Sequence, residues 1–582
     1  MLRIYIDLQE IDLLPGTSMQ IELNNPIFDA ENDKIKGGFS LPFTIPLTDR
    51  NRVIFGFPDV IDNFVNVRRE FTSHLEADGE TLQGVLKLRK IDKKKITANV
   101  MVGISAIGKS LQERKLNSFE YGGQREMGGS TPEAMAHMNL IASYPDDSDY
   151  TFAPLKNTIV FGEGKLDDFF KDHIINDFEN NRFILTPGDT TTRPRGLCPL
   201  PKLRYVLLQA LRELGLQVEE SFFDAELSRL FIISNAGLER IMPSAVKVWE
   251  TEVAHYETEY KYSFRIADLV PDLTVIDLLR KLAVTFGLSP QVSLNNKLQL
   301  AKLNDIIESQ DYLECSHLAS DPVEDIEDPE IFSFSYKTDN DDAEPSAHIA
   351  DFEDVTVLEP VPTYTYLQDT FRKDSGTAEP KQVRFVQDIR QYYIYKYTYN
   401  QIGWFYYSDD YAPIKSAAAG TDIPQGIAPV ICAKVDWNGE PTLLPVMQLK
   451  RTLPNIALNS PTPELRLLFY RGFQPYPVQE KIYPLLTDDV FNAKGEKIGN
   501  YSLRLDGEHG TYAKFLKPWY DFKSSSRTIR KKIAWSMVDL ANLNMNRKLA
   551  IDGNLYLVRK VTFSLPIRKV VDAELVLCKK GN

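Results

Sequence analysis

The chain has 582 residues, of which 43% are hydrophobic and 25% charged, so it is long enough for roughly three to five domains and is not expected to be disordered. Its 67 basic and 81 acidic residues give a net charge of −14, which argues against sequence-independent binding to a phosphate backbone. No window approaches the roughly 18 unbroken apolar residues of a membrane helix, so we expect no direct membrane insertion and a soluble product made in the cytoplasm.

The first 115 residues predict an antiparallel β unit. Asp78-Gly79 is a pair that tight hairpins prefer, because both central positions of the turn need a positive φ. Apolar and polar residues alternate over 85–88 and 96–102, which places a strand on each side of a Lys-rich loop.

The next segment matches the pattern of a phosphate loop. Gly103 to Ser110 reads G-x-x-x-x-G-K-S, in which Lys109 would reach a terminal phosphate and Ser110 would hold Mg²⁺. Such a loop needs a buried parallel strand before it and a packed helix after it. Here the preceding strand alternates like the return arm of a hairpin, and 111–116 is too polar for such a helix. We therefore interpret the match as fortuitous, and nucleotide binding stays a less favoured alternative.

Helical signals follow in the middle of the chain. Residues 130–133 combine a capping Ser-Thr with a Pro in the first turn. Apolar residues recur at helical spacing over 203–214 and 272–286, and each stripe ends at a Gly that serves as a stop. Residues 292–300 then predict a compact hairpin.

An acidic segment, 321–344, predicts a linker or an exposed loop. Its run Asp339 to Glu344 resembles a Ca²⁺ loop but lacks the Gly at the sixth position, and the twelfth position is Ala350 instead of Glu. We interpret the run as a solvated loop.

The stretch 384–411 is rich in aromatic residues. Tyr393, Tyr395, Tyr397 and Tyr399 alternate, which predicts a strand with these rings on one face. Ordinary packing within a sheet is the favoured interpretation. A sugar-binding platform that includes Trp404 is the alternative.

Two hairpins at opposite ends of the chain are similar. Asp78-Gly79 opens a strand, a loop and a return strand that ends at Val102. Asp552-Gly553 opens the same series, which ends at Leu577. Two related β domains around a middle section would explain this, although hairpins with Asp-Gly turns are common.

Residues that could take part in catalysis or metal binding are scattered along the chain. The four cysteines lie more than a hundred residues apart and predict isolated core residues: Cys198, Cys315, Cys432 and Cys578. The seven histidines form no ligand pair: His74, His137, His173, His255, His317, His348 and His509. We therefore predict no catalytic residue, no metal ligand and no cofactor. Paired catalytic carboxylates leave no fixed spacing in a sequence, so that alternative stays open.

Several stretches resemble the tail-hub, or baseplate-hub-like, proteins of phages and prophages of the Bacteroidetes. They are Phe39 to Pro58, Cys198 to Gly215, Leu269 to Asp277, and a C-terminal set that comprises Leu468 to Gly472, Gly510 to Phe515 and Ile551 to Val558. The resemblance implies a homotrimer in which each subunit contributes two similar tube-type β domains, so that three chains present six domains to a hexameric tail tube. It implies no catalytic residues.

The sequence thus predicts a β-rich, multidomain α+β protein that is not an enzyme. Its expected role is a structural tail hub that joins the tail tube to the baseplate or tail tip of a virion, with DNA passing through an acidic channel without specific binding. A glycan- or receptor-binding tail protein is the alternative. The predicted domains are a first tube-like β domain (1–115), an α+β domain (116–245), a small α+β domain (246–340), an aromatic-rich β domain (341–455) and a second tube-like β domain (456–582).

Overall fold

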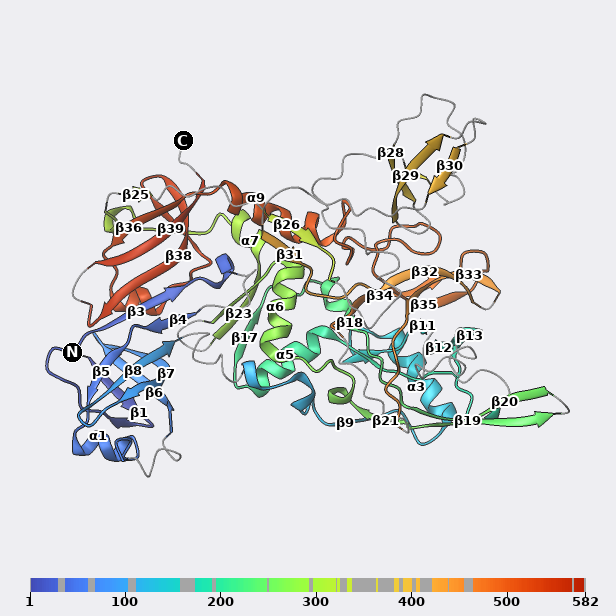
Figure 1. Ribbon diagram of the computed structural model, residues 1–582, viewed down its shortest axis with the longest axis horizontal. Coiled ribbons are helices and arrows are strands. Elements are labelled where there is room, and N and C mark those ends of the chain that lie inside the picture. Colours follow the sequence, from blue (N-terminus) through green and yellow to red (C-terminus); the bar gives the residue numbers. More distant parts are fainter. Residues whose placement is uncertain are drawn as a thin grey trace.

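The computed structural model describes residues 2–29, 37–60, 68–102, 111–157, 173–190, 195–248, 251–292, 297–320, 322–324, 332–337, 363–364, 381–386, 391–399, 405–408, 421–437, 439–454, 464–567 and 570–579. Over these ranges the protein is α+β and rich in strands, as predicted. Several sheets surround a small number of helices (Figure 1).

Strands from both ends of the chain, drawn in blue and red in Figure 1, form one sheet of 14 strands together with two short strands from residues 312–324. The junction lies between β3 and β38, which pair antiparallel from Met19↔Leu565 to Asn24↔Lys560. The strands are β1 (Arg3–Ile6), β2 (Gln9–Glu10), β3 (Met19–Asn24), β4 (Gly38–Ser40), β5 (Phe43–Pro46), β6 (Glu70–Ala77), β7 (Glu80–Ile91), β8 (Lys95–Val102), β24 (Tyr312–Glu314), β25 (Val323–Glu324), β36 (Thr528–Ile533), β37 (Lys548–Ile551), β38 (Asn554–Leu565) and β39 (Val571–Lys579). All pairings among β1 to β8 are antiparallel, which confirms that prediction for the described part of the first 115 residues.

Two groups of elements in this sheet follow the same order. The first is β5, the helix α1 (Asp49–Ile54), β6, β7 and β8; the second is β36, the helix α10 (Met537–Ala541), β37, β38 and β39. In each group the first strand pairs antiparallel with the last, and the last three strands pair in succession. A hydroxyl caps each helix: Thr48 Oγ1 accepts from the N–H of Asn51, and Ser536 Oγ from the N–H of Asp539.

The Asp-Gly turns have the backbone that the sequence predicts. Asp78 and Gly79 have φ of 51° and 89°, and Asp552 and Gly553 have φ of 52° and 78°. Two consecutive positive φ angles define the turn whose twist matches a hairpin, and Gly takes the second position without strain. Each turn leads into a middle strand of 12 residues.

The two ends of the chain also share one core. A single cluster of buried apolar side chains draws on residues 2–102, on Cys315 and on residues 529–575. Asn25, 1% exposed, fastens the junction, because its Nδ2 donates to the carbonyl oxygens of Met545 and Val558, each at 2.9 Å. A second buried cluster fills the middle of the molecule. The division into five domains stays a prediction.

The predicted helices are present as α3 (Thr131–Ser143), α5 (Leu203–Glu213) and α6 (Val275–Phe286). Gly215 and Gly287 have φ of 79° and 57° just beyond the last two, which confirms their role as stops. The third helix begins at Val275 instead of Asp272, because Thr274 caps it by accepting from the N–H of Asp277 at 3.2 Å. The hairpin after it is formed by β22 (Leu288–Val292) and β23 (Lys297–Lys302).

The prediction of a linker or exposed loop over 321–344 is wrong in two stretches. There, β25 pairs with β36, and β26 (Phe332–Ser335) pairs with β31 (Thr421–Pro424). Phe334 is buried and packs on the rings of Tyr512 and Tyr520, each with centroids 4.9 Å away. Aromatic side chains inside the acidic run supply the burial energy that its composition conceals.

The aromatic stretch forms the predicted strand, β29 (Gln391–Tyr399). It pairs antiparallel with β28 (Lys381–Val386) and β30 (Phe405–Ser408). Its side chains and Trp404 lie outside the described part of the structure.

A long hairpin extends from the body at the end opposite the joined sheet (Figure 1). Its strands, β19 (Glu239–Val248) and β20 (Thr251–Tyr260), pair antiparallel along their whole length. Near its root lie the sheets of β11 (Leu155–Asn157), β12 (His173–Ile175), β32 (Ile431–Trp437) and β33 (Glu440–Met447), and of β18 (Leu230–Ile232), β34 (Leu467–Pro475) and β35 (Ile482–Thr487).

Candidate assembly surface

The joined sheet turns one face to the core and one face outward, because side chains alternate along each strand. In β7, Leu82, Leu86 and Leu88 are buried while Gln83 and Arg89 are exposed. The side chains that β6, β7 and β8 turn outward are Glu70, Thr72, His74, Glu76, Gln83, Val85, Lys87, Arg89, Thr97 and Met101, and Asn99 lies on the same side but is 5% exposed. This face is mostly polar and is suited to contact water or another protein.

Charged side chains on the face are paired across strands. Lys87 Nζ lies 2.8 Å from a carboxylate oxygen of Glu70, and Arg89 Nε donates to Asn99 Oδ1 at 2.8 Å. Cross-strand pairs of this kind stabilise a sheet by roughly 0.2–1 kcal/mol each. The first pair balances two opposite charges, whereas Asn99 is neutral and leaves the positive charge of Arg89 on the face.

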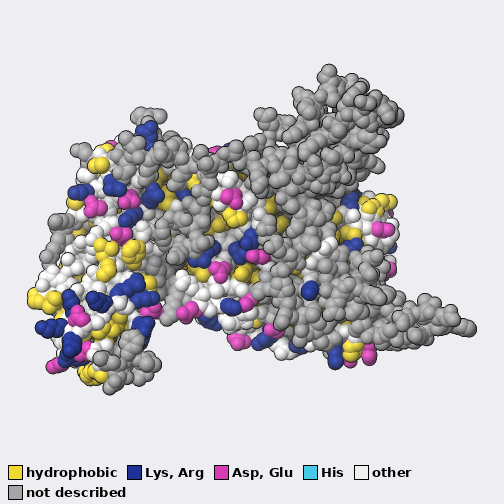
Figure 2. Space-filling view, in the orientation of Figure 1, with side chains coloured by type: hydrophobic (Ala, Val, Ile, Leu, Met, Phe, Trp, Pro, Cys, Tyr) yellow, Lys and Arg dark blue, Asp and Glu magenta, His cyan; other side chains and the backbone are white. Residues whose placement is uncertain are grey.

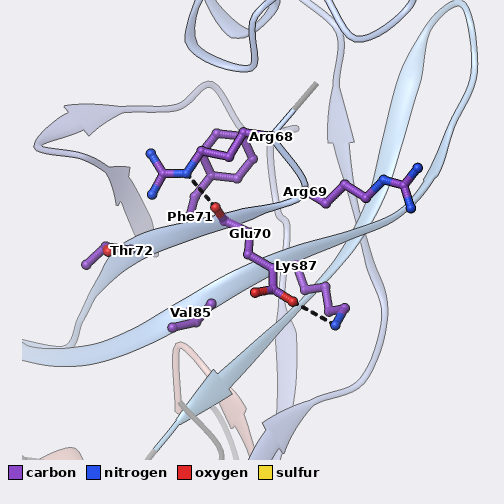
Figure 3. Close-up of a pocket in the computed structure, with 7 residues that line it drawn as sticks. All are labelled: Arg68, Arg69, Glu70, Phe71, Thr72, Val85 and Lys87. Carbon is purple, nitrogen blue, oxygen red and sulfur yellow. Dashed lines mark hydrogen bonds and ion pairs between the residues drawn. The ribbon is translucent and has the colours of Figure 1, made fainter. Parts of the chain in front are cut away.

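A hollow of about 630 Å³ opens where β6 begins (Figure 3). Arg68, Arg69, Glu70, Phe71, Thr72, Val85 and Lys87 line it. The Arg68 guanidinium lies over the Phe71 ring, 5.0 Å from its centre, and pairs with Asp7 at 2.6 Å. Lys87 and Glu70, both in its lining, form an ion pair at 2.8 Å. The lining is mostly polar and charged, with Phe71 and Val85 as its apolar members.

The second group of strands continues the pattern. Lys560 on β38 pairs with Glu22 on β3 at 3.1 Å, so an ion pair crosses the junction on the outward side. Arg530 on β36 lies opposite Glu574 on β39, at 4.0 Å, and Lys532 lies opposite Asp572. Basic and acidic side chains alternate across the face, and this sets the sign pattern that a partner would meet.

The chain was compared with protein families, curated sequences and solved structures. No protein-family model and no curated protein sequence matches the chain. Among solved structures, the 43 kDa tail protein of prophage MuSo2 from Shewanella oneidensis aligns with 99% of this chain and 96% of its own, at 9% identity and a TM-score of 0.33. A likeness this slight carries no conclusion about fold or function.

The phosphate-loop match at Gly103–Ser110, with Lys109, lies outside the described residues. The strand before it is described. It is β8, which pairs antiparallel with β4, β5 and β7. A phosphate loop requires a parallel strand at this position, so the prediction of a hairpin return arm is confirmed. The Ca²⁺-like run Asp339–Glu344 also lies outside the described residues.

Three of the four cysteines are buried core residues, as predicted, while Cys578 is partly exposed. Burial raises the pKa of the Cys198 thiol to about 12, which keeps it protonated and unreactive at neutral pH. In the described ranges, no three His, Cys, Asp or Glu side chains lie together in a way that could hold a metal ion. No helix in those ranges has the length and apolar character needed to cross a membrane.

One buried ion pair gave no signal in the sequence. Arg451 and Glu239 are both fully buried, with Nη2 2.7 Å from Oε1. Glu239 also accepts from the N–H of Leu197 at 2.9 Å, and Arg451 Nη1 lies 3.4 Å from His173 Nε2. Burial raises the pKa of Glu239, while the neighbouring guanidinium opposes the shift. The pair fixes the first residue of the long hairpin to the body.

Proposed function

We propose that the chain is a structural protein of a phage-type tail, and more specifically the hub that joins the tail tube to the baseplate or tail tip. The observation that carries the proposal is the pair of element groups with the same order, which come from opposite ends of the chain and lie in one sheet. A β unit that occurs twice within one chain doubles the number of equivalent units that a symmetric ring of chains presents around its axis.

The two groups support the proposed pair of related β domains. Each has a strand, a capped helix, an Asp-Gly hairpin and a return strand that pairs with the first. In a homotrimer, three copies present six such groups, which fits a hexameric tube. The antiparallel pairing of β3 with β38 joins the two groups in one continuous sheet, which supports a single tube-like unit instead of two separate domains.

The outward face supports a role in assembly. Ion pairs such as Lys87–Glu70 and Lys560–Glu22 balance part of its charge, which suits a surface that meets protein partners or lines a wet channel. We retain the proposal that DNA passes this protein without specific binding, which rests on the net charge of −14. The function needs no cofactor and no bond-making step, so the protein is proposed to be no enzyme.

The test uses tail particles from the native host. Antibody labelling in negative-stain microscopy is expected to mark one end of the tail, and quantitative mass spectrometry to give three copies per particle, half the number in one tube ring. A label spread along the tail, or a copy number that is no multiple of three, would refute the hub. The tube protein, labelled in the same way, is the control for antibody access.

A further inference from the structure

The junction inside the chain shows how two of the repeated groups fit together. The helix α10 of the second group lies against β7 of the first. Just after β38, the N–H of Ile567 donates at 2.7 Å to a carboxylate oxygen of Asp78, in the Asp-Gly turn of the first group. The junction thus joins the helix end of the second group to the turn end of the first. The helix end of the first group and the turn end of the second take no part in it.

The two groups are in register when they are counted from their Asp-Gly turns. Three successive residue pairs beside each turn have the same spacing from it in both groups. The strands that follow, β7 and β38, each have 12 residues. Lys93 is therefore the counterpart of Ile567, because each is the second residue after its strand. In the same way, Asp552 is the counterpart of Asp78.

The helix end of the first group exposes apolar side chains. Val53 on α1 is 63% exposed, and Phe57, just after the helix, is also exposed. In the corresponding helix, α10, Met537 and Leu540 are buried in the cluster that both groups share. In Figure 2, hydrophobic and basic side chains lie together at the lower left, over the part of the molecule that holds α1. Exposed apolar groups that lie together often mark a protein contact.

A basic loop, residues 92–95, lies beside the start of α1. The N–H of Leu47 donates to the carbonyl oxygen of Lys94 at 2.8 Å, which holds the loop next to the helix. Lys93, Lys94 and Lys95 are exposed. The carboxylate of Asp92 accepts from the N–H groups of Lys94 and Lys95, each at 2.9 Å, and so shapes the loop. The helix end therefore presents basic and apolar groups together.

The turn end of the second group has complementary features. Ser316 joins two carboxylates there: its Oγ accepts from the N–H of Asp552, and its N–H donates to exposed Glu314, each at 2.9 Å. Lys531 pairs with Asp552 from the inner side at 3.0 Å, yet 63% of the Asp552 side chain is exposed. Beside them, β24 exposes the ring of Tyr312. Acidic and apolar groups thus lie together at this end.

We propose that the helix end of the first group in one copy binds the turn end of the second group in the next copy. In Figure 1, α1 and β25, which follows β24 in the chain, lie at opposite ends of the joined sheet, so a chain cannot close this contact on itself. The contact repeats between chains the junction that exists within one: Asp552 takes the place of Asp78, and Lys93 that of Ile567. Opposite charges favour this pairing.

A head-to-tail contact of this kind closes a ring when the rotation fits. The inference rests on the proposed function, since it names the contact that would hold the ring of copies together.

A disulfide tests the contact against a control of equivalent geometry. Lys93→Cys with Asp552→Cys is expected to link neighbouring copies. Asp78→Cys with Ile567→Cys is expected to form the equivalent link within one chain, because these residues already touch. Non-reducing electrophoresis of tail particles and of the concentrated purified chain separates linked copies from single ones. Single-cysteine variants give the background from the four native cysteines.

An intermolecular link between positions 93 and 552 in either sample supports the contact. Its absence from both samples, while the control link forms, overturns the contact. A link from position 93 to a different protein or to another region also overturns it.

Two further changes in the Lys93→Cys, Asp552→Cys chain test which groups hold the contact. Val53→Glu places a charge in the apolar part and is expected to lower the yield of the link about tenfold. Glu314→Lys is expected to lower it more at low salt than at high salt. The matched controls are Leu140→Glu, on the exposed side of α3, and Glu480→Lys, and both should leave the yield unchanged. Circular dichroism verifies that each variant folds, and an unchanged yield with Val53→Glu and Glu314→Lys overturns the proposal.

Antibody labelling of the same particles separates this inference from the proposed function. A chain that the label places at one end of the tail, but that forms no link between positions 93 and 552, refutes the contact and leaves the hub intact. A chain that forms the link in purified form, but that the label does not place at one end of the tail, keeps the contact and refutes the hub.

Discussion

Replacing Arg451 by Met tests whether the buried ion pair with Glu239 holds the long hairpin, β19–β20, to the body of the protein. The change leaves the Glu239 carboxylate fully buried, 2.9 Å from the N–H of Leu197 but without its cation. Removing one partner of a buried pair costs about 3–5 kcal/mol, because the remaining charge is uncompensated. We expect a loss of this size at neutral pH and above.

The loss should depend on pH with a definite sign. Without Arg451, burial is opposed only by backbone N–H donors such as that of Leu197, so the pKa of Glu239 stays above the unfolded value of about 4.3. A raised folded pKa gives stability that is present at low pH and lost as pH rises through the folded pKa. The deficit of the variant should therefore grow between pH 5 and pH 8.

The assay is native-state hydrogen exchange at the Leu197 amide, because a chain of this size need not unfold in one step. The double variant Glu239→Gln, Arg451→Met should recover most of the loss. Arg265→Met is the matched control: it breaks a 2.7 Å pair with Asp268 whose side chains are 54% and 52% exposed, and it should change nothing. A single variant that behaves like this control, or a double variant whose cost is the sum of the single ones, would refute the reasoning.

Three further outcomes are expected. Gly79→Ala and Gly553→Ala should each lower the melting temperature, by about 1–2 kcal/mol of stability for a positive φ, and a clear difference between the two would contradict equivalent roles in the two groups. Asn25→Ala leaves two buried carbonyls without their donor and should cost about 1–3 kcal/mol, seen as faster hydrogen exchange in β38. Burial lowers the pKa of His137, which lies 2.8 Å from the hydroxyl of Tyr150, so the unfolded chain binds the proton more readily and stability should decrease as pH falls below about 6.5. Melting curves of His137→Phe should lack this slope.

Local features were predictable because they depend on neighbours in the sequence. Gly215, Gly287 and the Asp-Gly turns each impose a backbone conformation, and the helices and hairpins followed from them. The start of α6 was misplaced by three residues, since an apolar stripe does not reveal which hydroxyl serves as the cap. The two strands in the acidic segment were missed because its acidic composition predicts a solvent-exposed loop, although the segment also contains apolar side chains that can pack in a sheet.

Long-range features left no comparable signal. Nothing in the sequence around Met19 or Leu565 indicates that these residues pair, although the repeated Asp-Gly hairpins pointed to related ends. The ion pair of Glu239 and Arg451 is separated by more than two hundred residues, and charged residues are predicted at the surface by default. For the outward face of the joined sheet, the sequence revealed only that apolar and polar residues alternate within single strands. It did not reveal which strands lie side by side.

The pairing of β3 with β38 has a consequence for synthesis. A ribosome finishes β3 more than five hundred residues before it makes the strand that covers the edge of β3. Until then the nascent chain carries an open strand edge and half of a shared core, the features that make folding slow and aggregation easy. Chains that terminate early never cover that edge, so they keep an unpaired strand that finished chains do not expose. The joined sheet can therefore be completed only after the C-terminal strands have been made.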